Sequence, residues 1–100
     1  MKIKTSVICH YRNESPDADG NNTRASFIWE GELPFVLTAG MIFSPLEEEA
    51  GVRVEEVNWC ANSKAVTADG TCELAWPQSL FDQLVEVLRE TFSDVEVFTT

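Results

Sequence analysis

A single amphipathic helix near the C-terminus is the feature that most limits how this chain can fold. Apolar residues recur every three to four positions over residues 80–92, and polar residues fill the rest of that stretch. The spacing predicts a helix with one apolar stripe, formed by Leu80, Phe81, Leu84, Val85, Leu88 and Phe92. The helix begins either with Pro77 in its first turn or two residues later, where Ser79 and Asp82 resemble a capping box. We expect this stripe to face a sheet.

Alternating residues predict the strands of that sheet. Apolar and polar side chains alternate over residues 2–11 and again over 25–30, which is typical of strands. Residues 12–23 between them are mostly turn formers and predict a loop. Gly31 and Glu32 predict a short turn after the second strand.

The longest apolar stretch, residues 33–43, is interrupted twice. Pro34 has no amide donor and therefore belongs at the start or the edge of a strand. Gly40 predicts a bend that separates residues 35–37 from residues 41–43. Residues 46–51 predict an acidic connection with room for one helical turn.

A change of phase follows in residues 52–60. Val52 and Val54 share one face, whereas the next apolar residue of the alternation, Val57, is displaced by one position. A slip of one residue moves side chains to the opposite face, so the sequence predicts a β-bulge at Glu55 and Glu56.

Turn formers divide the region after this strand. They predict turns at residues 62–63 and 69–70, the second being a hairpin signal between strands at 65–67 and 71–76. Residues 95–98, after the helix, predict a short last strand.

These elements predict one domain of the α+β class over residues 1–100. Short connections between successive strands favour antiparallel pairing. We therefore expect a twisted, mostly antiparallel sheet of about five to six strands with one C-terminal helix packed on one face. A small, partly open barrel closed by the helix is the alternative.

The charge of the chain limits its partners. Seventeen Asp and Glu residues against seven Lys and Arg residues give a net charge of −10, while a hydrophobic content of 44% predicts a folded core. Such a charge argues against direct binding to nucleic acid or to anionic membranes. It is compatible with a basic protein partner, a cation, or solubility alone. A homodimer is also possible. Without a signal peptide or a membrane-spanning run in the sequence, we expect the cytoplasm.

Two metal-binding patterns are incomplete. Asp17, Asp19 and Asn21 place oxygen ligands at alternate positions, as in the first half of an EF-hand loop. Asn22 then stands where that loop needs glycine, and Ile28 where it needs a bidentate Glu. The cysteines and the one histidine lack the paired spacing of structural zinc sites. We therefore expect an ordinary turn, with no metal and no cofactor.

Catalytic patterns are equally weak. Cys9, Cys60 and Cys72 predict reduced, mostly buried thiols, with a Cys60–Cys72 disulfide across a hairpin as the alternative. Cys9 and His10 are adjacent, but neighbours in a strand point to opposite faces, so we do not expect a nucleophile–base pair. The sequence has no phosphate-binding loop and no nucleophile-elbow motif. We expect no enzymatic activity.

Aromatic residues in phase with the apolar faces predict core packing: Phe27, Trp29, Trp59, Phe81 and Phe92. Ile28 and Phe98 fall on the polar phase of their strands. They predict either a contact patch for another protein or a face covered by the chain itself or by a dimer partner.

The sequence thus favours a small, non-catalytic protein-binding module whose acidic residues dock on a basic, nucleic-acid-binding protein. In size, charge and α+β make-up alone, it is similar to small acidic phage and plasmid proteins, among them anti-CRISPR and anti-restriction inhibitors, which present carboxylates where phosphates would lie. The candidate partner-binding residues are Glu47, Glu48, Glu49, Glu55, Glu56, Asp82, Glu86 and Glu90. The alternative is a small enzyme or ligand carrier with a cavity between helix and sheet, lined by an inward-pointing Cys60, Cys72, His10 or Tyr11.

Overall fold

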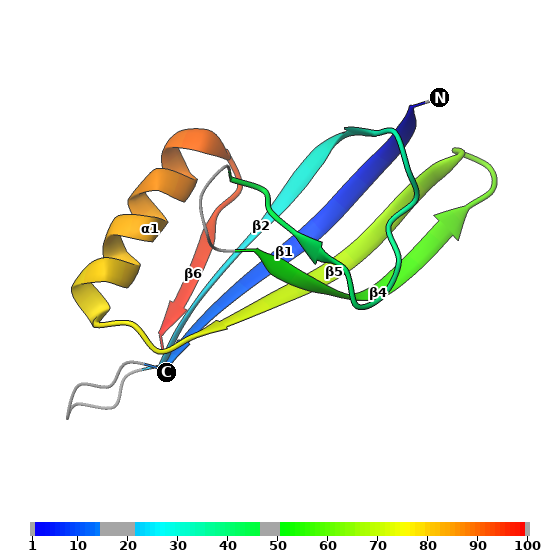
Figure 1. Ribbon diagram of the computed structural model, residues 1–100. Helices are drawn as coiled ribbons and strands as arrows, with labels where there is room; N and C mark the ends of the chain where they lie inside the picture. The colour runs from blue at the N-terminus through cyan, green and yellow to red at the C-terminus, as the bar shows by residue number, and fades with distance from the viewer. Residues whose placement is uncertain (1, 15–21, 47–50, 100) are drawn as a thin grey trace.

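A computed structural model describes residues 2–14, 22–46 and 51–99 (Figure 1). The elements in chain order are β1 (Ile3–Glu14), β2 (Asn22–Leu33), β3 (Ile42–Phe43), β4 (Val52–Cys60), β5 (Ala65–Leu74), α1 (Gln78–Thr91) and β6 (Glu96–Thr99). The strands form one six-stranded sheet in the order β3-β4-β5-β1-β2-β6. The predicted α+β class, with one helix near the C-terminus, is confirmed.

The sheet is mixed, with β1 in its interior. β1 pairs antiparallel with β2 along its whole length and parallel with β5 on its other side. The remaining pairs, β2–β6, β3–β4 and β4–β5, are antiparallel. The sheet is therefore mostly antiparallel, as predicted, with a parallel pair near its centre.

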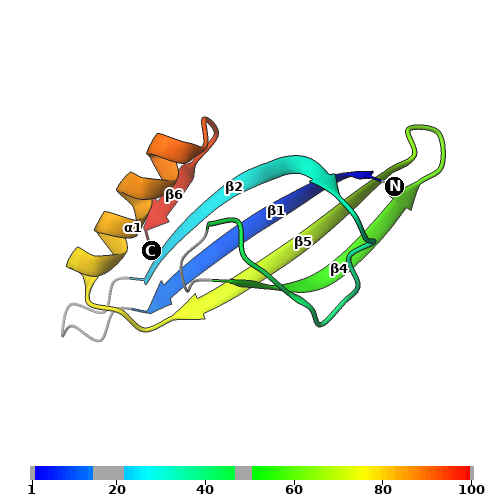
Figure 2. The ribbon, with the colours of Figure 1, turned by 45° about the horizontal axis from the view of Figure 1, so that its top comes forward.

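Alternation in β1 separates an inner face from an outer face. Thr5, Val7, Cys9 and Tyr11 are buried, whereas the intervening Lys4, Ile8 and Arg12 are exposed. Figure 2 shows α1 and the segment that follows β2 on the same side of the sheet, the inner face. Within the described residues, no further element covers the outer face.

α1 covers one half of the inner face with Phe81, Val85 and Leu88. Beyond its last turn, the ring of Phe92 stacks on Phe27 of β2, with 4.3 Å between the ring centroids. Phe27 in turn stacks on Tyr11 of β1, at 5.9 Å. Three aromatic rings thus connect the end of the helix to the middle of the sheet.

The start of α1 is fixed by a side chain from β1. The buried Asn13 donates from its Nδ2 to the carbonyl of Trp76 (3.1 Å) and accepts from the Trp76 amide at its Oδ1 (2.8 Å). Pro77 occupies the N-cap without a side-chain cap hydrogen bond, so the predicted capping box of Ser79 and Asp82 is not formed. The buried amide of Asn13 anchors the helix entry instead.

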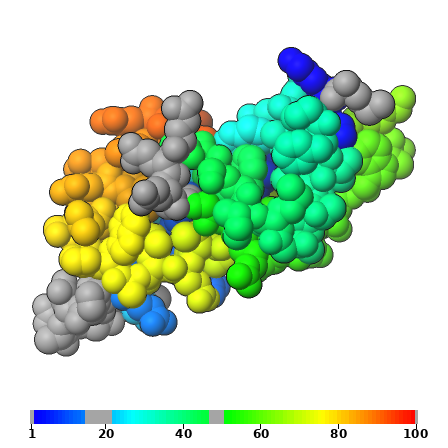
Figure 3. Space-filling view, viewed as in Figure 1, coloured from blue at the N-terminus to red at the C-terminus, as the bar shows by residue number. Residues whose placement is uncertain are grey.

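Residues 34–46 cover the other half of the inner face. Leu37 of this segment is buried in the core, and the Phe43 ring packs edge-on against Trp29, with 4.8 Å between centroids. Figure 3 shows these residues, in cyan and green, lying beside the helix on the same side of the molecule. The predicted bend at Gly40 is confirmed by its φ of +94°, but residues 35–37 do not form a strand.

The loop prediction for residues 12–23 is wrong at both ends, while residues 15–21 lie outside the described residues, and the turn predicted at Gly31 and Glu32 is wrong. β1 continues to Glu14 and β2 begins at Asn22, so both ends of the predicted loop at residues 12–23 are paired. Gly31 and Glu32 also lie within β2, opposite Thr5 and Lys4. Cross-strand pairing here outweighs the turn preference of the individual residues.

The predicted hairpin at Asp69 and Gly70 is wrong for a packing reason. β5 is continuous through both residues. A Cβ atom on Gly70 would lie 2.6 Å from Cγ2 of Val52, so the glycine allows the inner face of β4 to approach β5. In this strand glycine marks a close approach rather than a turn.

The predicted bulge is confirmed by a register shift between Val54 and Glu56, and a turn at residues 61–64 confirms the predicted turn at 62–63. Trp59, in contrast, is 57% exposed rather than part of the core. Trp59 lies on the same face as its buried β5 partner Val66, near the end of β4 that is farthest from β3.

Candidate functional site

The acidic residues of α1 form one exposed ridge. Asp82, Glu86 and Glu90 are four positions apart and all are exposed. Asp82 accepts a hydrogen bond from Nε2 of Gln78 (2.9 Å), which holds its carboxylate against the helix. At a rise of 1.5 Å per residue, successive carboxylates are spaced about 6 Å apart along the axis. The ridge lies on the side of α1 that faces away from the sheet.

Two uncovered apolar side chains lie about 110° around the helix from this ridge, on the other edge of its solvent side. Leu80 is 47% exposed and Val87 is 45% exposed, and the seven positions between them correspond to two helical turns. The prediction that Leu80 is buried is wrong, because the sheet covers only the stripe of Phe81, Val85 and Leu88. The solvent side of α1 therefore combines carboxylates with apolar side chains that the fold does not cover.

Glu55 and Glu56 lie on β4, on the outer side of the sheet. Glu56 is the partner of Asp69, which alternates with the buried Ala68 and Gly70 of β5. Glu55, the extra residue of the bulge, is exposed and acts electrostatically on the outward-facing His10. The bulge thus places both carboxylates on the same face.

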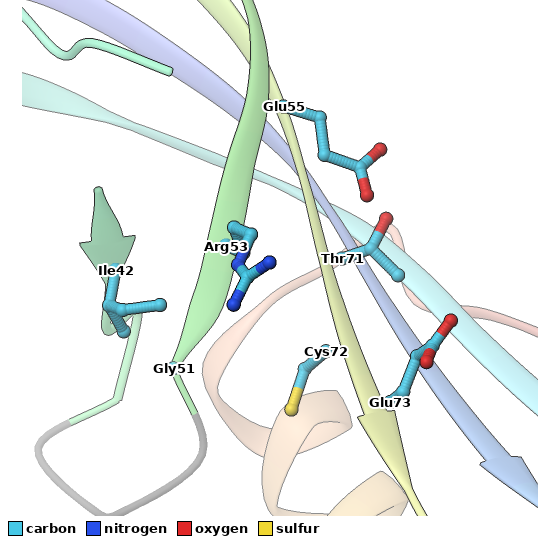
Figure 4. Close-up of a pocket in the computed structure, with 7 residues that line it drawn as sticks. All are labelled: Ile42, Gly51, Arg53, Glu55, Thr71, Cys72 and Glu73. Carbon is cyan, nitrogen blue, oxygen red and sulfur yellow. The ribbon is translucent and has the colours of Figure 1, made fainter. Parts of the chain in front are cut away.

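Glu55 borders a hollow of about 350 Å³ across β4 and β5 (Figure 4). Arg53 and Thr71 lie beside Glu55 in this hollow, whereas the thiol of Cys72 points away from that carboxylate. The lining combines a guanidinium with the carboxylates of Glu55 and Glu73. Because its lining includes a positive charge, this hollow is a less acidic surface than the ridge on α1.

The described candidate residues therefore fall into two groups. The ridge of α1 lies over the inner face of the sheet, and the pair on β4 lies on the outer face. A flat partner surface contacts one group or the other. The remaining candidates, Glu47, Glu48 and Glu49, lie outside the described residues, as do Asp17, Asp19 and Asn21 of the calcium-like pattern.

The outer face contains a pair that sequence reasoning did not identify. Nδ1 of His10 and Oγ of Ser26 are 2.8 Å apart across β1 and β2. Burial, and then the neighbouring Arg24, lower the pKa of His10. Cys9 points into the core, so the prediction that Cys9 and His10 occupy opposite faces is confirmed. The register of two distant strands creates the His10–Ser26 pair, and no local pattern signals it.

The three cysteines occupy different environments. Burial raises the pKa of Cys9 to about 12 and also raises the pKa of Cys72. Cys60 is exposed, and a hydrogen bond from Ser63 lowers its pKa. Cys60 pairs with Ala65, seven residues before Cys72, a separation of roughly 23 Å along β5. A Cys60–Cys72 disulfide is therefore ruled out in this fold.

Two hollows lined by described residues lie away from the space between helix and sheet. One lies across β4 and β5, and the other lies at the ends of β1, β2 and β6. No residue of α1 lines either of them. Of the four residues predicted to line a cavity between helix and sheet, Tyr11 alone is fully buried, and its ring stacks on Phe27.

Comparisons with protein-family models, with curated proteins and with solved structures found no match. Within the described residues, no group of three His, Cys, Asp or Glu side chains is arranged to hold a metal ion. The same residues contain no helix that is long and apolar enough to cross a membrane. The surfaces themselves are the basis for assigning a function.

Proposed function

We propose that this chain is a non-catalytic protein-binding module that docks the solvent side of α1 on a basic protein surface. The observation that carries the proposal is the exposed ridge of Asp82, Glu86 and Glu90 together with the uncovered Leu80 and Val87. Protein interfaces combine an apolar centre with a polar rim, and complementary charge steers the partners together.

The physical cost of the ridge supports this proposal. Like charges four residues apart on a helix destabilise it by a few tenths of a kcal/mol per pair. Arg89, the one basic residue of the described last turn, relieves only part of that repulsion. A basic partner would compensate the repulsion and would also cover the two apolar side chains.

The partner we favour is a nucleic-acid-binding protein. Its basic surface is built to neutralise closely spaced phosphates, and the ridge offers carboxylates about 6 Å apart along a rigid helix. Charge mimicry of nucleic acid is therefore the specific form of this proposal. It requires that DNA or RNA competes with the chain for the same partner.

The test is affinity capture from host lysate with mass spectrometry, comparing the wild-type chain with two triple charge reversals. One replaces Asp82, Glu86 and Glu90 by Lys. The matched control replaces Glu30, Glu55 and Glu56 by Lys, which gives the same change in net charge on the outer face. Circular dichroism checks that both variants fold.

We expect a basic protein that is retained by the wild type and the control, lost by the α1 variant, and released as salt rises. If duplex DNA or RNA competes with the chain for this protein, the result supports mimicry. If neither competes, the result supports docking through α1 but contradicts mimicry. Equal capture by all three chains, or loss only in the control, would overturn docking through α1.

A further inference from the structure

A second charged surface lies on the outer face, at the ends of β1, β2 and β6. A hollow of about 330 Å³ is lined there by Arg12, Asn13, Glu14, Asn22, Thr23, Arg24 and Phe98. Arg12 and Arg24 are direct partners in the β1–β2 register, and both are exposed on the outer face. Their side chains therefore project from the outer face of the sheet side by side.

The arginine pair adjoins carboxylates, but it forms no ion pair with those of the described residues. Glu73 is the β5 partner of Arg12, and Glu14 lines the hollow. Among the described residues, however, neither guanidinium forms an ion pair with a carboxylate. Like charges directly opposite each other in a sheet are destabilising. Two of the seven Lys and Arg residues of the chain are thus direct cross-strand partners.

Phe98 gives the hollow an apolar wall. Its ring is 46% exposed, and Cζ of Arg24 lies 5.2 Å from its centroid. This cation–π contact fixes the orientation of the Arg24 side chain over the ring. Phe98 and both arginines therefore border the same hollow.

We propose that this hollow binds an oxyanion, either carboxylate or phosphate, carried on a group with an apolar or aromatic body. Arg12 and Arg24 hold the oxyanion with their planar donor forks, which match the geometry of both anions. Phe98 packs against the attached body. The site lies on the face opposite to α1 and is independent of the docking proposed above.

The pKa of His10 should report whether the hollow contains an anion. This residue is the only histidine of the chain and lies in β1 two residues before Arg12. Its pKa is lowered by burial first and by Arg24 second, with Arg12 acting in the same direction and Asp69 and Glu55 opposing. An anion between the two arginines would cancel part of their field. The pKa of His10 should therefore rise when the hollow is occupied.

The experiment is an NMR titration of the isotope-labelled full chain with three probes: phenyl phosphate, inorganic phosphate and benzoate. Arginine Nε–Hε signals report binding, and the His10 ring signal reports the pKa. We expect saturable shifts at Arg12 and Arg24, smaller ones at Arg53 and Arg89, and an upward shift of the His10 pKa. Phenyl phosphate should bind several-fold more tightly than inorganic phosphate, because only the former contacts the ring of Phe98.

Comparison of the two aromatic probes identifies the anion. Tighter binding of benzoate indicates a carboxylate ligand, such as an acidic peptide, and tighter binding of phenyl phosphate indicates a phosphorylated one. Shifts that do not saturate, or that are equal at all four arginines, would show general ionic screening and overturn the proposal.

Four substitutions define the site. Arg24→Gln should weaken binding of phenyl phosphate by about tenfold or more, which corresponds to the loss of one charge-assisted contact. Arg89→Gln, on α1, is the matched control and should leave binding unchanged. Phe98→Ala should remove the advantage of phenyl phosphate over inorganic phosphate, and Glu14→Gln should strengthen binding by removing a nearby negative charge. Unchanged affinity of a folded Arg24→Gln variant for phenyl phosphate would contradict the proposal.

Discussion

The rings of Phe27 and Phe92 stack with their centroids 4.3 Å apart, joining the residue that follows α1 to the middle strands of the sheet. Phe92 is half-buried, and Phe27 is 2% exposed. The helix has only 14 residues and would be marginal alone in water. Its stability therefore depends on such contacts with the sheet.

We predict that Phe92→Ala lowers the free energy of unfolding by about 2–4 kcal/mol, because it removes an aromatic side chain from the interface between helix and sheet. Denaturant unfolding followed by circular dichroism measures the loss. Phe98→Ala is the control, since that exposed ring should cost less than about 1 kcal/mol. Equal losses in the two variants would contradict the proposed packing.

Asn13 carries a second prediction. Replacing it by Ala leaves the amide and the carbonyl of Trp76 without their partner, and each unsatisfied buried group costs about 1–3 kcal/mol. We expect a loss of about 2–3 kcal/mol and faster hydrogen exchange of the Trp76 amide. Asn58→Ala, at an exposed position of β4, should change stability by less than about 0.5 kcal/mol. Unaltered exchange at Trp76 would show that Asn13 does not anchor the helix entry.

Gly70 and Val52 should be energetically coupled. Gly70→Ala places a Cβ atom against Val52, and overpacking of this kind costs about 1–3 kcal/mol. Val52→Ala alone leaves a cavity and is destabilising as well. In the double variant each change relieves the other, so the combined loss should be smaller than the sum of the single losses. Additive losses would mean that the two residues do not contact.

The cysteines should react in the order Cys60, Cys72, Cys9. Cys60 is exposed and its pKa is lowered by Ser63, whereas burial raises the pKa of Cys9 to about 12. Because the thiolate is the reactive form, Ser63→Ala should shift the pH profile of Cys60 alkylation to higher pH. Peptide mass spectrometry after brief labelling measures the order, with Ser79→Ala as the unaffected control. Early labelling of Cys9 would indicate that the core opens.

Periodicity was sufficient to predict the elements with strong alternation. The inward residues of β1, the apolar stripe of α1 and the bulge at Glu55 and Glu56 all follow from spacing along the chain. Whether a residue at the edge of such a pattern is buried depends on how two elements pack against each other. Leu80 and Trp59 are in phase with apolar residues but lie beyond the surfaces that could cover them.

Long-range pairing was not accessible from local patterns. The parallel pairing of β1 with β5 is specified by contacts between distant segments, and it includes Asp69 and Gly70. The contact with Val52 of β4 makes Gly70 a packing residue rather than a turn residue. The pair of Arg12 and Arg24 was missed because residues 12–23 have the composition of a loop. The continuation of both strands to Glu14 and Asn22 brings the two arginines together.

The position of β1 between β2 and β5 also determines when the sheet can form during synthesis of the chain. β1 is synthesised before the other described strands, yet one of its two edges has no partner until β5 has left the ribosome. Half of the inner face also stays uncovered until α1 follows. Such non-local closure slows folding, so the nascent chain exposes an unpaired strand edge for most of its synthesis. The interval before β5 emerges is when this protein is most vulnerable to aggregation.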